Sequence, residues 1–376
     1  MRTARWLKII NGLPALLALT VLACLLGHAP AWADTPAVVA QKPHSYRDPN
    51  FDYFVSGDPG LPRAPHTQFM VALMGGGGSV DAAFKALAQH AGAGHILILR
   101  AVADNSFDPE DGDYGTSFAT KWGPVASAET ITFHNRQAAY DPRVLAALHA
   151  ADGIFIAGGD QGNYVRYWKG TPVQEALNAH VRADRPIGGS SAGLAILGHY
   201  SYPCLDGISL ESKVALADPF NASVMTENDL LHFRGLEQVI TDSHFSARSR
   251  LGRSIVFLAR LNQGQSHPGI FGLGIDEKTA LLVDGSGHAR LAAGSAGSAW
   301  LSVLTEPALT LTRGQPLSIK GVKIVRLGPD SVLELKTHAV QGALASTELT
   351  IEHGVPAPDA LTAAMMLRDK VPPGED

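Results

Sequence analysis

The chain has 376 residues, of which 45% are hydrophobic, so it is long enough and apolar enough to bury a sizeable core. Thirty Lys and Arg against thirty-five Asp and Glu give a net charge of -5. This balance gives no basic footprint of the kind that binds nucleic acid, and the composition is that of an ordinary globular protein.

The N-terminus has the order of a cleavable secretory signal. Three basic residues precede an apolar run over 13–26, and small residues follow, ending in Ala31-Trp32-Ala33. This order predicts cleavage after Ala33 and a secreted or periplasmic protein. The run is short for a bilayer span and no second run follows it, so we expect no stable membrane association.

Three further regions are distinguished by their residue patterns. Residues 34–66 are rich in Pro, Asp and Tyr without periodicity, which predicts an irregular N-terminal arm. Over 67–288, short apolar runs alternate with helical patterns, which predicts an α/β domain with a mostly parallel sheet flanked by helices. Residues 289–376 contain strand-like runs and Gly-rich turns, which predict a β-rich C-terminal extension and tail.

The segment Gly189-Ser190-Ser191-Ala192-Gly193 follows a short apolar strand and has the Gly-x-Ser-x-Gly spacing. A sharp turn from a strand into a helix needs residues without bulk on both sides of the central serine. Such a turn would expose the Ser191 hydroxyl as a nucleophile and direct the next backbone N–H toward a developing oxyanion. A turn that merely needs small residues for close helix packing is the alternative interpretation.

Two other glycine-rich segments follow predicted strands. Gly75-Gly76-Gly77-Gly78 lacks the spacing of a P-loop or a dinucleotide fingerprint, and we interpret it as a wall of the cleft. In Ala157-Gly158-Gly159-Asp160-Gln161, the Gly159 N–H is a candidate oxyanion donor and Gln161 a candidate substrate contact. A strand-to-helix turn capped by Asp160 explains the second segment equally well.

A serine nucleophile needs a base, and His244 is the candidate because it follows an apolar strand and precedes three arginines. These arginines can bind a substrate that carries carboxylates. If a helix began at His244, only Arg248 would share its face, and Arg250 and Arg253 would then serve structural ion pairs.

Taken together, these segments resemble the cyanophycinases, within the peptidase E-like serine hydrolases. The resemblance runs from about Gln68 to Asp284. It rests on the order and spacing of Gly75–Gly78 with Asp81 and Phe84, Gly158–Gln161, Gly189–Gly193, Asp242 with His244-Phe245, the three arginines, and Gly274-Ile275-Asp276-Glu277 with Thr279-Ala280.

The resemblance implies a fold similar to class I glutamine amidotransferases, with Ser191 as nucleophile and His244 as base. It implies the N–H groups of Gly159 and Ala192 as the oxyanion hole. The residues that it implies for substrate binding are Gln161, Asp242 and Arg248, with Asp160, Arg250 and Arg253 as further candidates.

The third catalytic member of the family is an acid, which we expect between the serine and the histidine. Glu211 is our first choice, with Asp206 and Asp218 as alternatives. One residue departs from the family pattern: cyanophycinases usually carry Gln between the Asp and the His, where this chain has Ser243. This departure leaves the substrate open, because the position adjoins the base.

The resemblance implies hydrolysis of cyanophycin to β-Asp-Arg dipeptides through an acyl-enzyme, without a metal or cofactor. The open alternatives are the same chemistry on other aspartyl or isoaspartyl peptides, and a non-catalytic protein that binds a ligand in the same cleft. The acidic stretch over 108–113 can meet guanidinium groups, but a solvated surface loop is the simpler interpretation. Pairing of edge strands makes a homodimer possible.

Overall fold

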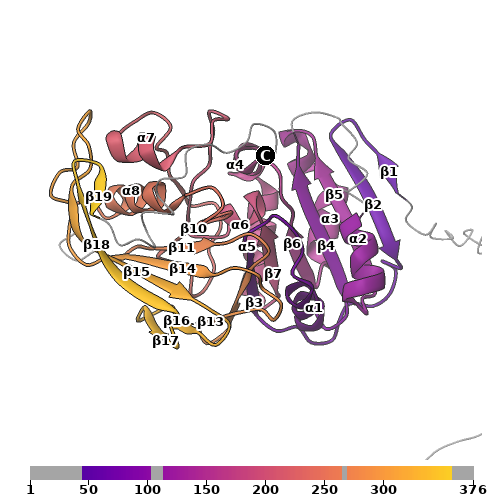
Figure 1. Cartoon of the computed structure of the whole chain (residues 1–376). Helices are drawn as coiled ribbons and strands as arrows, with labels where there is room; N and C mark the ends of the chain where they lie inside the picture. The colour runs from indigo at the N-terminus through magenta and orange to yellow at the C-terminus, as the bar shows by residue number, and fades with distance from the viewer. Residues whose placement is uncertain (1–44, 103–112, 265–268, 358–376) are drawn as a thin grey trace, which may run out of the picture. The chain divides into compact units, whose positions relative to one another are not determined.

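Two mixed β-sheets organise the chain, and each combines strands that lie far apart in the sequence (Figure 1). The computed structural model describes residues 45–102, 113–264 and 269–357. All of them belong to one compact unit that spans Lys42–Asp376. The predicted signal segment, and most of the acidic stretch over 108–113, lie outside the described residues.

The first sheet has eleven strands among the described residues, in the order β1-β2-β5-β4-β6-β7-β3-β12-β13-β16-β17. Its centre, from β5 to β3, is parallel, while the strands that flank it on both sides are antiparallel. The predicted parallel sheet is therefore confirmed only for the centre, and the fold is mixed α/β. The bounds are β1 Tyr46–Arg47, β2 Phe51–Gly57, β3 Met70–Met74, β4 His95–Ala101, β5 Ser127–Phe133, β6 Gly153–Ile156, β7 Ile187–Ser190, β12 Ala280–Asp284, β13 His288–Leu291, β16 Val332–Glu334 and β17 Ala339–Gln341.

The central strands are apolar on both faces because helices cover both faces. In β3, Val71 and Leu73 join the core cluster that contains helices α3 and α5, whereas Ala72 and Met74 join the cluster around α1. This alternation is the two-residue period of a strand. The helical segments are α1 Asp81–His90, α2 Asp113–Ser117, η2 Phe118–Trp122, η3 Arg136–Tyr140, α3 Pro142–Ala150, α4 Gln161–Trp168, α5 Pro172–Arg182, α6 Ala192–Ala195, α7 Ser212–Ala217 and α8 Leu251–Leu261.

The second sheet has eight strands among the described residues, in the order β19-β18-β15-β14-β11-β10-β8-β9. Strands β8, β10 and β11 are parallel, and the strands from β14 onward are antiparallel. Helix α8 packs in the core cluster of this sheet. The bounds are β8 Tyr200–Ser201, β9 Glu227–Asn228, β10 Val239–Asp242, β11 Phe271–Ile275, β14 Ala299–Leu304, β15 Ile319–Leu327, β18 Ala345–Glu352 and β19 Val355–Ala357.

Two regional predictions differ from the structure. The segment expected to be an irregular arm contains β2, which pairs with β5 along its full seven residues. Its Phe51 and Tyr53 are buried in the main core cluster, and aromatic residues at alternate positions suit a strand. The region after residue 288 is β-rich, as predicted, but its strands are shared between the two sheets and do not form a separate extension, because β14 pairs with β11 and β16 pairs with β13.

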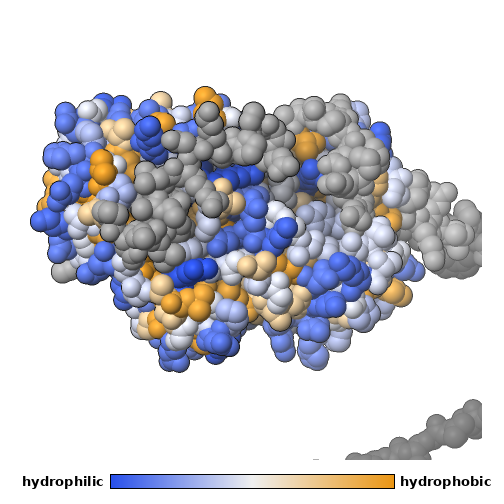
Figure 2. Space-filling model, viewed as in Figure 1, coloured by the Kyte–Doolittle hydropathy of each residue, from blue (hydrophilic) through white to orange (hydrophobic). Residues whose placement is uncertain are grey.

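Hydrophilic residues dominate the face shown in Figure 2, and hydrophobic residues there form small scattered groups. None of the helices that the structure describes is both long enough and apolar enough to cross a membrane.

Candidate active site

Ser191 lies at the turn from β7 into α6, with backbone angles of φ 53° and ψ -116°. A side chain at Gly189 would meet the Gly193 carbonyl oxygen at 2.5 Å, and one at Gly193 would meet the Ile156 carbonyl oxygen at 2.1 Å. Only glycine fits on either side of the serine, which explains the Gly-x-Ser-x-Gly pattern. A positive φ at a non-glycine residue is strained and is held here by the surrounding backbone, including the hydrogen bond from the Ser191 N–H to the Met74 carbonyl oxygen.

His244 is the base that the structure brings to Ser191. Its Nε2 lies 2.7 Å from the Ser191 Oγ. Ser191 follows β7 of the first sheet and His244 follows β10 of the second, so the contact joins turns that leave two different sheets. The imidazole is buried, with 8% of its side chain exposed. The 2.7 Å distance allows the hydrogen bond that a serine nucleophile needs with its base.

The carboxylate at His244 belongs to Glu277, whose Oε1 lies 2.7 Å from the His244 Nδ1. Glu277 is in the turn between β11 and β12, 33 residues after the histidine. Glu211, which we expected at this position, is exposed where α7 begins.

The two alternatives to Glu211 make other contacts. Asp206 accepts hydrogen bonds from the Ser223 hydroxyl and the Ile208 N–H, and Asp218 accepts from the N–H groups of Phe220 and Gly314. The prediction failed because it required the acid to precede the histidine in the chain. The pair Asp276-Glu277 was already among the marks of the resemblance and was the available signal.

Asp276 holds the turn that carries Glu277. Its Oδ1 accepts from the Ser246 N–H at 3.0 Å and from the Trp300 Nε1–H at 3.1 Å, and its Oδ2 accepts from the Ser298 N–H at 3.0 Å. These bonds join the turn both to the segment after His244 and to β14. Asp276 thus positions the acid and the base relative to one another.

The glycine segment 75–78 lies directly against the base and the acid, which extends its predicted role as a wall of the cleft. The Gly75 carbonyl accepts from the His244 N–H at 2.9 Å. A Cβ at Gly76 would meet the His244 Nε2 at 2.6 Å, and one at Gly77 would meet the Glu277 side chain at 2.8 Å. The segment needs glycines because the imidazole and the carboxylate occupy the space of a side chain.

Burial is the largest cause that lowers the pKa of His244, to about 4, and the neighbouring guanidinium groups of Arg248 and Arg250 lower it further. The hydrogen bond with Glu277 acts in the opposite direction, because it favours the imidazolium. At neutral pH the imidazole is therefore neutral and can accept a proton. An Nδ1–H that donates to Glu277 leaves the Nε2 lone pair directed at Ser191.

A cavity of about 570 Å³ surrounds Ser191 and His244. Gly159, Ala192 and Gln161 line it, as do Arg248 and Arg250. Arg100, at the end of β4, also lines it and was missed in the sequence because an arginine next to an apolar strand has no distinctive pattern. The cavity wall is therefore rich in guanidinium groups, which suit carboxylate-bearing ligands.

Asp242 and Arg253, both predicted to bind substrate, are not among the residues that line this cavity. They form a buried ion pair in which the Arg253 Nη2 and Nε lie 2.6 and 2.8 Å from the two Asp242 carboxylate oxygens. Arg250 contributes a longer contact of 3.4 Å to Asp242. Arg253 therefore forms a structural ion pair, which was the alternative to substrate binding in the sequence analysis.

Asp160 lines the cavity and also caps α4, because its Oδ1 accepts from the Gly162 N–H at 2.7 Å. The structure is therefore compatible with both interpretations of the segment 157–161, as part of the substrate site and as a strand-to-helix turn capped by Asp160.

Ala192 is the first residue of α6, so its N–H has no acceptor within the helix and is available to an oxyanion. Gly159 lies on the same cavity with a φ of +142°, which only glycine adopts readily.

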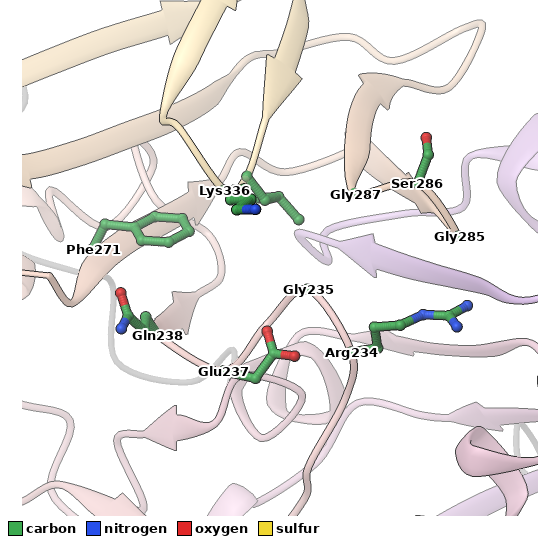
Figure 3. Close-up of a pocket in the computed structure, with 10 residues that line it drawn as sticks. Arg234, Gly235, Glu237, Gln238, Phe271, Gly285, Ser286, Gly287 and Lys336 are labelled. Atoms are coloured by element: carbon green, nitrogen blue, oxygen red, sulfur yellow. The ribbon is translucent and has the colours of Figure 1, made fainter.

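A second cavity, also of about 570 Å³, lies between the two sheets near the start of β10 (Figure 3). Arg234, Glu237 and Lys336 give its wall both signs of charge. None of the three residues of the Ser191–His244–Glu277 chain lines it. Volume does not separate the two cavities, and the nucleophile–base contact identifies the first as the candidate active site.

The chain is similar in sequence to known peptidases. Peptidase family S51 matches residues 110–291. The cyanophycinase of Trichormus variabilis is 31% identical over 185 residues, which is 49% of this chain and 52% of that protein. The cyanophycinase of Synechococcus elongatus is 28% identical over 225 residues, 58% of this chain and 63% of that protein. The chain thus spans about half to two thirds of the length of these relatives.

Two solved structures also match. A peptidase from an acI-B1 Actinobacterium has a TM-score of 0.48 and 17% identity, covering 72% of this chain and 98% of that one. A putative peptidase E protein from Listeria monocytogenes has a TM-score of 0.39 and 13% identity, covering 60% and 98%. The sequence matches confirm the resemblance to the cyanophycinases, and residues 110–291 of the chain match peptidase family S51.

Proposed function

We propose that this protein is a serine peptidase that hydrolyses cyanophycin to β-Asp-Arg dipeptides. The observation that carries the proposal is the hydrogen-bonded chain from the Ser191 hydroxyl through the His244 imidazole to the Glu277 carboxylate, with 2.7 Å at each contact. The similarity to the cyanophycinases supports the choice of substrate.

In the proposed reaction, the Ser191 Oγ attacks the carbonyl carbon of the aspartyl bond while His244 Nε2 takes the hydroxyl proton. The N–H groups of Gly159 and Ala192 donate hydrogen bonds to the oxyanion. The imidazolium then gives its proton to the leaving amine, which leaves an acyl-enzyme on Ser191. Water, deprotonated by the same histidine, attacks the ester, and Ser191 recovers its proton as the acid product leaves. Glu277 fixes the tautomer of His244 and stabilises the imidazolium.

The guanidinium-rich wall fits a substrate built from aspartate. Arg248, Arg250 and Arg100 line the cavity together, and Gln161 adds an amide that can donate or accept a hydrogen bond. Carboxylates of the substrate would bind the arginines by charge-assisted hydrogen bonds.

The first test is incubation of the purified protein with insoluble cyanophycin, followed by mass spectrometry of the soluble products. We expect β-Asp-Arg from the wild type and none from the Ser191→Ala protein. A serine-directed covalent probe should label Ser191 in the wild type. Absence of both labelling and product would support a binding protein without peptidase activity.

Ser243 favours a second candidate, the same chemistry on other aspartyl or isoaspartyl peptides. Its side chain is buried on the cavity wall and its Oγ accepts from Arg250 Nη1 at 3.3 Å, so it sets the position of a substrate-facing cation. A library of aspartyl dipeptides separates the two candidates. Cleavage confined to short peptides, with no release from the polymer, would exclude cyanophycin as the substrate.

We also propose that the chain is exported and cleaved after Ala33, on the pattern of its first 33 residues. Expression of the full chain in a secreting host, followed by N-terminal sequencing of the exported protein, tests this. The expected first residue is Asp34, and retention of the intact chain inside the cell would contradict export.

A further inference from the structure

Two histidines face one another at a place separate from the candidate active site. The Nδ1 of His199 and the Nδ1 of His232 lie 3.2 Å apart, and the ring centres are 5.1 Å apart. The Nε2 of His232 lies 2.9 Å from the Asp229 Oδ1. We call this group of His199, His232 and Asp229 the histidine pair site.

The histidine pair site lies at the opposite end of β10 from the catalytic base. Tyr200, next to His199, is the register partner of Ile240 in β10, and His244 follows β10 at its other end. The pair does not line the cavity around Ser191. Whatever it binds is therefore separate from the nucleophile and its base.

The backbones of both histidines are anchored by hydrogen bonds to other parts of the chain. The His232 N–H donates to the Asn178 Oδ1 at 2.8 Å, and Asn178 is itself buried in α5. The His199 N–H donates to the Leu236 carbonyl at 3.4 Å. The two imidazoles thus face each other from anchored segments.

The separation of the two nitrogens suits a shared metal ion. With metal–nitrogen bonds of about 2.0–2.1 Å, two imidazole ligands on one tetrahedral ion have nitrogens about 3.3 Å apart. The 3.2 Å distance between the Nδ1 atoms is close to that value. The Asp229 carboxylate would accept the Nε2–H of His232, which leaves the Nδ1 lone pair free and directs it toward His199. A carboxylate on the distal nitrogen is the usual companion of a metal-bound histidine.

Groups of both charges lie near the pair. The carboxylates of Asp229 and Glu237 both act on His199, and Arg234, which lines a small cavity with His232, is paired with Asp184 at 3.1 Å. Among the described residues, no group of three or more His, Cys, Asp or Glu side chains could hold a metal. The site therefore offers two imidazoles and needs water for its remaining ligands, which suits Zn²⁺, Cu²⁺ or Ni²⁺ and not Ca²⁺ or Mg²⁺.

We propose that His199 and His232 bind one divalent transition-metal ion through their Nδ1 atoms, with Asp229 orienting His232 and water completing the coordination shell. A hydrogen bond from one imidazole to the other is the competing explanation of the same geometry. It predicts no metal binding by the pair.

The test is calorimetric titration of tag-free protein with ZnCl₂, after removal of bound metals with a chelator. We expect saturable binding of one ion that raises the melting temperature, and that is lost in both His199→Ala and His232→Ala. The Asp229→Ala change should weaken binding by about 10- to 100-fold, because the orienting carboxylate is gone. CuCl₂ should bind more tightly than ZnCl₂, and CaCl₂ should give no heat of binding.

The matched control is His149→Ala, which removes an exposed histidine of α3 and should leave zinc binding unchanged. Circular dichroism without metal establishes that each variant is folded. Absence of saturable zinc binding, or binding that both His199→Ala and His232→Ala retain, would overturn the proposal. The same titration in the Ser191→Ala background should give the same stoichiometry, so this result does not depend on the proposed peptidase activity.

Discussion

At the scale of single residues, the backbone of the candidate site is strained at its two central residues, Ser191 and His244. Ser191 and His244 both have positive φ, 53° and 44°, and the glycines beside them leave the space that their side chains occupy. Such strain persists where the surrounding structure over-determines it and is typical of functional sites. Substitutions of single residues are therefore the most specific tests of the site.

The first test concerns the acid. Glu277→Gln removes the charge that stabilises the His244 imidazolium and allows the wrong tautomer, so we expect kcat to fall by about 10²- to 10⁴-fold. Glu211→Gln makes the same chemical change at an exposed residue and should leave kcat close to that of the wild type. Steady-state kinetics on the two variants compare them directly, and a larger loss in Glu211→Gln would reverse our assignment.

The second test concerns the pH dependence. Because burial and neighbouring arginines lower the pKa of His244 to about 4, the base stays neutral until the pH falls to that value. The rate of Ser191 labelling by a covalent probe should hold down to about pH 4 and not fall near the ordinary histidine value of about 6.5. Arg248→Ala removes one cause of the lowering and should move the midpoint to higher pH.

The third test concerns the glycine segment 75–78. Gly76 has a φ of +87°, and a Cβ there would meet the His244 Nε2 at 2.6 Å, so Gly76→Ala should displace the base and lower kcat by at least about tenfold. Gly294 has a φ of +80° and no atom within 4 Å of an added Cβ. Gly294→Ala therefore carries similar backbone strain without the clash, and it should keep full activity. Equal losses in both variants would attribute the effect to strain alone.

At the scale of elements, short strands of the second sheet and the turns that follow them place the base and the acid. His244 follows β10, and Glu277 follows β11, which pairs with β10 in parallel. Neighbouring parallel strands end at the same edge of a sheet, so their following turns meet. The buried pair of Asp242 and Arg253 connects the end of β10 to α8, next to the turn that carries His244.

This pair predicts a large effect on stability. Asp242→Asn leaves the fully buried Arg253 without its counter-charge and should cost about 3–5 kcal/mol of unfolding free energy. Asp184→Asn breaks the solvent-exposed contact with Arg234 and should cost about 0–1 kcal/mol. Urea denaturation at neutral pH measures both. A loss below about 1 kcal/mol in Asp242→Asn would contradict a structural role.

The same pair predicts a pH dependence with a definite sign. Burial raises the pKa of Asp242, but Arg253 and Arg250 outweigh it and hold the pKa below its ordinary value. The stabilisation is therefore complete above the unfolded pKa of about 3.9 and is lost as the pH falls through the folded pKa. The difference in stability between the wild type and Asp242→Asn should shrink below about pH 4 in the same denaturation experiment.

At the scale of the whole molecule, the strands after residue 288 are part of the structure that holds the site. Leu301 of β14 and Leu327 of β15 are fully buried in the same core cluster as Val71 and Ile154 of the first sheet. Trp300 of β14 also donates to Asp276 beside the acid. A chain that ends at residue 288 loses these contacts and exposes β11 as an unpaired edge.

We therefore expect a chain truncated after residue 288 to be insoluble or unfolded, as measured by soluble yield and circular dichroism. Removal of residues 358–376, which lie after β19, is the matched control and should leave a folded protein. A truncated chain that folds and binds the covalent probe would restore the predicted boundary at residue 288.

The homodimer remains a prediction at this scale. The outermost strands of both described sheets, β1, β17, β19 and β9, have only two or three residues each. Short edges offer little backbone for pairing between copies, so a dimer would need other surfaces. Size-exclusion chromatography with light scattering measures the mass in solution.

The sequence by itself determined the local parts of this protein. The Gly-x-Ser-x-Gly spacing, the apolar strand before it and the position of His244 after another strand depend on neighbouring residues, so local patterns could predict Ser191 and its base. The alternation of apolar runs and helical patterns likewise predicted the parallel centre of the first sheet. These features follow from backbone sterics and periodicity, which act over a few residues.

Only the tertiary structure decided which residues meet across the chain. It placed Glu277 and not Glu211 at His244, enclosed Asp242 with Arg253 away from the cavity, and made β2 and the strands after residue 288 parts of the two sheets. Many carboxylates in the sequence could pair with a histidine, and the strand register selects one of them. When two residues meet because two sheets pack together, the packing sets the distance between them. The number of residues that separates them in the sequence does not predict such a contact.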